Sequence, residues 1–124
     1  MRHPLLALAL LLAACGTEEA PASSGTLHIE ARPDPDPPRV GQNALELHVT
    51  DADGNPVAGA AVTVDTFMPS MGHGSTEQPQ IADEGGGTYR ASPLTFHMVG
   101  TWQVTVHAAA GGEEGEARFT WEVD

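Results

Sequence analysis

The stretch that decides the fold runs from Thr101 to Val123 and reads TWQVTVHAAAGGEEGEARFTWEV. Apolar and polar side chains alternate in its two arms, Thr101–His107 and Glu116–Val123, and the glycine-rich segment Ala110–Gly115 separates them. Successive side chains of a strand point to opposite faces of a sheet, so an alternation of period two predicts a strand with one buried face. The stretch therefore predicts two strands, joined by an acidic loop, whose alternate residues face a core.

The same period of two recurs upstream of this stretch. Alternating or extended segments occupy residues 26–32, 43–50, 57–68, 80–83, 88–91 and 94–96. Turn-forming residues separate them, above all the runs PDPDPP at 33–38 and DADGNP at 51–56. About seven short strands with turn signals every 8–12 residues predict an all-β protein, an antiparallel β-sandwich.

Composition and motifs reduce the classes of function that this chain is expected to have. The 124 residues suffice for one domain, and they include 17 acidic residues, five arginines and no lysine, for a net charge of -12. Such a chain lacks the basic surface that nucleic acids require, so no nucleic acid partner is expected. The sequence carries no nucleophile elbow, phosphate-binding loop or dinucleotide-binding turn, and we expect it not to be an enzyme.

The N-terminus has the pattern of a lipoprotein signal peptide. A short basic start precedes the apolar run Leu5–Ala14, whose ten residues are too few to span a bilayer, which takes about 20. The run ends in Leu-Ala-Ala-Cys, which resembles the bacterial lipobox, with Cys15 as the lipidated residue. The alternative is an ordinary signal peptide with a chance cysteine. The pattern predicts a signal peptide over 1–14, a lipidated cysteine with a flexible tether over 15–25, and the sandwich over 26–124.

This anchor would place the protein in the cell envelope, facing the periplasm or the exterior. Residue 16 is Gly rather than Asp, so the usual signal for inner-membrane retention is missing, and an outer-membrane anchor is favoured if the source is Gram-negative. A lipidated Cys15 is a thioether, and the sole cysteine of the chain is then unavailable as a thiolate ligand or nucleophile.

Methionine and histidine gather in two segments of the domain. The first segment, FMPSMGHG, holds Met68, Met71 and His73, and the second, FHMVG, holds His97 and Met98. Thioether sulfur is a soft ligand that selects Cu(I), and imidazole adds a stronger donor. In a secreted compartment thioethers escape the disulfide formation that removes free thiols. The two segments therefore predict a copper site, most simply for Cu(I).

Each of these residues also has a structural interpretation. Met68 continues the parity of Val62 and Val64, and Met98 that of Leu94 and Phe96, so both methionines suit a core. His97 has the opposite parity and could be an exposed bystander. Met71 and His73 lie in a Gly/Pro loop, where burial gives no reason for a methionine, and they are the preferred ligands.

The remaining polar motifs are weaker. Asp51–Gly54 resembles the start of a calcium loop but fails the EF-hand spacing, and it predicts a hairpin turn instead. His28, His48 and His107 fall on outward strand faces. Two of them paired across strands would give a second site for Cu(II) or Zn²⁺, whereas solvated surface histidines are the simpler interpretation.

Five segments together resemble the YtkA-like (FixH-related) domain of secreted and membrane-anchored bacterial proteins. The resemblance covers residues 40–123, and the segments that carry it are Val40–Asn43, Asp51–Val57 with Gly59-Ala60, Met68–Gly74, Gly87–Tyr89 and Phe96–Trp102. The resemblance implies an immunoglobulin-like sandwich and a link to copper supply or tolerance outside the cytoplasm. The sequence departs from the family's pattern at Met98-Val99-Gly100, where Met-Pro-Gly is expected, and at His97.

We therefore expect a lipid-anchored, extracytoplasmic copper-binding protein that holds Cu(I) for delivery or tolerance. Its partners would be the copper ion, the membrane through Cys15, and an envelope protein that receives or exports copper. The main alternative is a β-sandwich interaction or scaffolding module without metal, and a less favoured one is a regulatory accessory of a transporter. The copper hypothesis requires Met71 and His73 to lie at the same end of the sandwich as residues 97–98.

Overall fold

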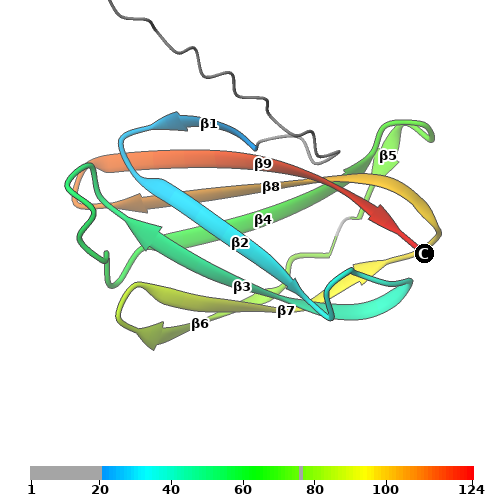
Figure 1. Cartoon of the computed structure of the whole chain (residues 1–124), viewed down its shortest axis with the longest axis horizontal. Coiled ribbons are helices and arrows are strands. Elements are labelled where there is room, and N and C mark those ends of the chain that lie inside the picture. The colour runs from blue at the N-terminus through cyan, green and yellow to red at the C-terminus, as the bar shows by residue number, and fades with distance from the viewer. Residues whose placement is uncertain (1–20, 76) are drawn as a thin grey trace, which may run out of the picture.

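Strands alone make up the regular structure of residues 21–75 and 77–124, which this computed structural model describes (Figure 1). The nine strands are β1 (Ala22–Gly25), β2 (His28–Asp34), β3 (Gly41–Thr50), β4 (Ala61–Met68), β5 (His73–Gly74), β6 (Gln80–Gly85), β7 (Thr88–Phe96), β8 (Gly100–Ala110) and β9 (Glu113–Val123).

The strands form two sheets in which every pairing is antiparallel. One sheet has the order β1-β9-β8-β4-β5 and the other the order β2-β3-β7-β6. Their inner faces enclose the core, so the predicted β-sandwich is confirmed. The prediction of about seven strands omitted the two shortest, β1 and β5.

The core is made by the alternation visible in the sequence. Along β4 and β8 every second side chain is buried, as a sheet with one solvated face requires. Trp102 is fully buried and its ring lies 5.2 Å from that of Phe96, in the adjoining strand of the other sheet. The core residues of the described part of the chain lie between Leu27 and Val123, so residues 16–124 hold these residues and the nine strands.

Two boundaries differ from the sequence-based expectation. Ala22–Gly25, assigned to the tether, instead form β1, which pairs with Gly115–Arg118 of β9, so the sandwich begins at residue 22 rather than 26. All four residues of β1 are exposed, and an edge strand that buries no side chain leaves no hydrophobic period to detect. The expected loop at 110–115 shortens to the turn Gly111–Gly112, because the β8–β9 ladder continues to the pair Ala110–Glu113.

Candidate metal-binding end

The first methionine segment is a tight hairpin. Met68 ends β4, His73 begins β5, and the two residues pair across the hairpin. The Met68 carbonyl accepts hydrogen bonds from the backbone N–H groups of Met71 and Gly72, at 3.1 and 3.0 Å. Gly72 has a φ of 70°, a left-handed conformation that glycine adopts without steric cost. The turn therefore holds Met71 out in solvent, with 51% of its surface exposed.

The second segment is the turn between β7 and β8. Phe96 and Gly100 end and begin these strands, which leaves His97, Met98 and Val99 in the turn. The indole N–H of Trp102 donates to the carbonyl of Met98 at 3.0 Å, which fixes the turn to the core. His97 is exposed, and 37% of the Met98 surface is exposed.

Strand pairing brings the two segments to one end of the sandwich. β4 and β8 are antiparallel with Phe67 opposite Gln103, so the last residues of β4 lie beside the first residues of β8. A Cβ added to Gly100 would collide with the methyl carbon of Met68, which shows that the two segments touch. Figure 1 places the β5 hairpin and the β7–β8 turn at the same end, next to the end of β9.

Burial divides the five predicted ligands into two groups. Met71, His73, His97 and Met98 are exposed on the two turns. Met68 is only 3% exposed and belongs to the core, so its environment matches the structural interpretation of this residue. The parity argument that suggested burial for Met98 fails, because β7 ends at Phe96 and the alternation does not continue into the turn.

Sequence reasoning missed the apolar residues around these donors. Among the described residues, the large hydrophobic side chains that are exposed all lie at this end: Val40, Phe67, Met71, Met98 and Val99. Val40 belongs to this end because its N–H donates to the carbonyl of Asp124, just beyond the end of β9. Exposed apolar residues gathered on one face are typical of a surface that contacts another molecule.

Thr66 and Met68 are successive inward-facing residues of β4. The hydroxyl oxygen of Thr66 is buried without a hydrogen-bond partner in the described structure. A buried, unpaired hydroxyl destabilises the folded state, and valine has nearly the same shape without the polar atom. We expect Thr66→Val to raise the free energy of unfolding by about 1 kcal/mol in urea denaturation. Thr63→Val, on the exposed face of the same strand, should change it by less than about 0.5 kcal/mol. A destabilised Thr66→Val variant would show that the hydroxyl is paired.

The other histidines face outward, as predicted. His107 Nε2 lies 3.1 Å from a carboxylate oxygen of Glu114, and His48 Nδ1 lies 3.5 Å from the hydroxyl of Thr88. His28, the first residue of β2, pairs with Thr50, the last residue of β3. Within residues 21–75 and 77–124, no three His, Cys, Asp or Glu side chains gather as a metal site. Methionine sulfur lies outside that set of donors.

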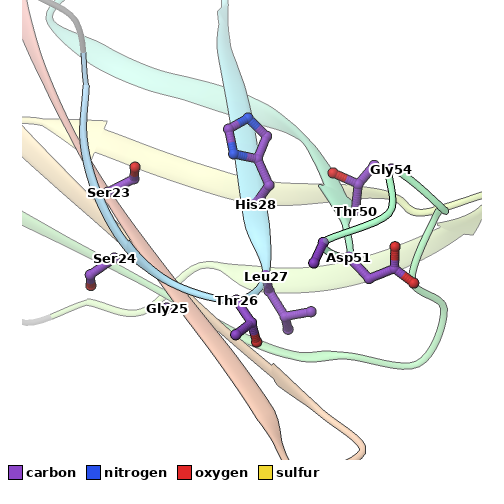
Figure 2. Close-up of a pocket in the computed structure, with 10 residues that line it drawn as sticks. Ser23, Ser24, Gly25, Thr26, Leu27, His28, Thr50, Asp51 and Gly54 are labelled. Carbon is purple, nitrogen blue, oxygen red and sulfur yellow. The ribbon is translucent and has the colours of Figure 1, made fainter.

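The Asp51–Gly54 motif is a turn, but the prediction that it closes a hairpin is wrong, because it leads from β3 in one sheet to β4 in the other. One carboxylate oxygen of Asp51 accepts hydrogen bonds from the backbone N–H groups of Asp53 and Asn55, both at 2.9 Å. Beside it lies a shallow depression of about 370 Å³ at the end opposite the methionines. Figure 2 shows His28 on the wall of this depression and the Asp51 side chain on the neighbouring loop.

Charged side chains link the strands on the outer face of the four-stranded sheet. Arg90 of β7 bonds Asp34 at 3.0 Å and Glu46 at 3.3 Å. A hydrogen bond with Glu46 raises the pKa of the Glu84 carboxyl, and partial desolvation adds to the rise. This network lies on exposed surface, where ion pairs contribute little to stability.

The fold and this end together define a β-sandwich domain with methionine and histidine on adjoining turns. The family model for YtkA-like domains matches residues 22–107, so the chain belongs to the YtkA-like family. The match begins at β1, upstream of the resemblance seen in the sequence, and ends within β8. Comparison with curated proteins and with solved structures finds no match. No helix long and apolar enough to cross a membrane occurs in the part of the chain that the structure describes.

Proposed function

We propose that this protein is a lipid-anchored, extracytoplasmic copper-binding protein that holds Cu(I) at the two turns and passes it on. Met71, His73, His97 and Met98 would be the ligands, and Met68 would support the hairpin from the core. The copper is cargo in this proposal, and the protein acts by binding rather than by catalysis.

The observation that carries the proposal is the contact between Met68 and Gly100. It joins the hairpin that displays Met71 and His73 to the turn that displays His97 and Met98. Two thioethers and two imidazoles on adjoining, solvent-facing turns make a soft donor set, which favours Cu(I) over hard cations.

Exposure of the donors suits transfer of the ion. Each turn offers one thioether and one imidazole, so a partner's ligands can replace those of one turn while the other still holds the copper. The exposed side chains of Val40, Phe67 and Val99 belong to the same end of the sandwich and offer apolar contact area to such a partner. The lipid anchor at Cys15 belongs to the same proposal and lies outside the described residues.

Anaerobic titration of residues 16–124 with Cu(I), against a chromogenic chelator, tests the proposal. This segment contains all nine strands and the core, and it omits the Cys15 thiol. We expect one equivalent to bind. The Met71→Ala/His73→Ala variant should bind at least about 100-fold more weakly, because losing direct ligands costs more than the 10–100-fold typical of outer-shell changes.

Two control variants locate the site. Met68→Leu preserves buried volume and should keep the affinity for Cu(I), because Met68 packs in the core. His28→Ala/His107→Ala removes two imidazoles away from the proposed site and should also keep it. Failure of the unaltered domain to compete with the chelator would disprove the copper proposal. The non-metal interaction module, which the exposed Val40, Phe67 and Val99 favour, would then be the better account.

A further inference from the structure

A groove of about 1040 Å³ runs along the open side of the sandwich, between β2 of one sheet and β9 of the other. Its apolar lining includes Ile29 and Ala31 from β2, and Phe119 and Trp121 from β9. None of these residues is among the proposed copper ligands, so the groove is a separate surface of the molecule.

β1 covers only part of the edge of β9 that borders the groove. β1 pairs only with Gly115–Arg118, and Figure 1 shows it alongside the first half of β9. Beyond Arg118, the outer edge of β9 has no strand partner within the described residues. Backbone N–H and C=O groups on a free strand edge are ready to pair with another extended chain.

Trp121 shows that this part of the core is incompletely covered. The alternation along β9 points Trp121 inward, with Phe119 and Val123, yet those two side chains are buried and Trp121 is only partly so. Its ring stacks on that of Phe119 at 5.5 Å and an interplanar angle of 23°. An inward-facing tryptophan left in contact with solvent gives an added chain apolar surface to bury, and tryptophan is enriched among residues that dominate binding.

The charges of the groove are of one sign. Glu30, Asp36 and Glu122 line it together with the apolar residues, and no arginine is among the described residues of its lining. All three carboxylate side chains belong to exposed residues. The whole chain adds to this field, with a net charge of -12 and no lysine. Complementary charge favours a basic occupant.

We propose that the groove binds an extended segment of a partner protein in which basic and apolar residues alternate, as an added strand beside Phe119–Val123. Its backbone would pair with the free edge of β9, its apolar side chains would cover Trp121, and its basic side chains would meet the three carboxylates. Such strand addition draws affinity from main-chain hydrogen bonds and specificity from alternate side chains.

Two other occupants, the chain's own segment before Pro21 and a second copy of the chain, fit this surface less well. The residues just before Pro21 include Glu18 and Glu19, so pairing them along β9 would bring like charges together near Glu122. A second copy of the chain would set one acidic groove against another. Like charges brought together across an interface oppose binding.

NMR titration of residues 16–124 with an acetylated, amidated heptapeptide of alternating lysine and valine tests the proposal. We expect shifts of the backbone amides of Phe119–Val123 and of the Trp121 indole, while the buried indole of Trp102 serves as an internal reference. A heptapeptide with glutamate in place of lysine should not bind. Methylating alternate backbone nitrogens of the lysine peptide should weaken binding at least about tenfold, since it removes the ladder donors.

Matched charge reversals separate the groove from the general acidity of the chain. Glu30→Lys/Asp36→Lys should weaken binding of the lysine peptide at least about tenfold and permit binding of the glutamate peptide. Asp53→Lys/Glu77→Lys makes the same change at exposed positions outside the groove and should change the affinity less than about threefold. Folding of each variant is checked from its amide spectrum.

Four results would overturn the proposal. The first is a set of shifts that misses Phe119–Val123, and the second is an equal loss of binding in the two charge-reversed variants. The third is tighter binding after removal of residues 16–20, which would mean that the chain's own segment fills the groove. The fourth is self-association at millimolar concentration with shifts along β9. None of these measurements involves copper, so this inference and the proposed function can fail independently.

Discussion

Trp102→Ala is expected to lower the free energy of unfolding by about 4 kcal/mol, within the 3–5 kcal/mol range for truncating a buried aromatic residue. Trp102 is fully buried, contacts the ring of Phe96, and donates its indole N–H to the Met98 carbonyl. Domains of this size have only about 5–15 kcal/mol of stability, so the variant should lose much of its urea resistance. Urea denaturation followed by circular dichroism measures the change.

Trp102→Phe separates the packing of this residue from its hydrogen bond. It keeps an aromatic ring but leaves the Met98 carbonyl without its donor, and we expect a smaller loss, about 2 kcal/mol. Trp121→Phe, on a partly exposed side chain, should cost about 1 kcal/mol. A Trp102→Ala variant as stable as Trp121→Phe would contradict the central place of Trp102 in the core. If the copper proposal holds, Trp102→Phe should also weaken Cu(I) binding, because the turn bearing His97 and Met98 loses its tie to the core.

Gly100→Val is expected to cost about 4 kcal/mol, for two reasons that add. The φ angle of Gly100 is 138°, which side-chain-bearing residues rarely adopt, and such strain costs about 1–3 kcal/mol. The new Cβ would also collide with the methyl carbon of Met68, so this buried side chain would have to adopt another conformation within the core. Overpacking a core adds about 1–3 kcal/mol. Urea denaturation of the variant measures the sum.

Gly41→Val is the matched control for the backbone strain. Gly41 has a φ of 106° and open space around its Cβ position, so this variant should lose only the strain energy. The difference between the two variants then isolates the collision with Met68. Equal losses in Gly100→Val and Gly41→Val would contradict the expected cost of the collision with Met68.

The local alternation of side chains was sufficient to predict most strands of the sandwich. β4, β8 and β9 each bury one face of a polar and apolar alternation, and β3 does so from Leu45 onward, so their residues predicted them. β1 and β5 lie beyond this reasoning, because β1 buries no side chain and β5 has two residues. Such elements form by backbone pairing with a strand distant in the sequence, and the residues of the short segment do not indicate which strand that is.

The candidate site was also predictable from the sequence only in part. The sequence alone identified the five candidate ligands, three methionines and two histidines. Thioether and imidazole groups are ligands for soft metals wherever they lie in a fold. It also suggested that Met68 suits a core, since this residue continues the parity of β4, and the structure buries it. The same parity argument failed for Met98, because the chain turns after Phe96.

The sequence by itself thus determined the strand-forming segments, the acidic character of the chain and the types of donor that it carries. Only the tertiary structure decided that the two turns lie together at one end, and that β1 stops short and leaves the edge of β9 open. The reason is physical: the alternation of a strand depends on neighbours two residues apart, whereas the register of β4 on β8, and of β1 on β9, joins residues that are far apart in the chain.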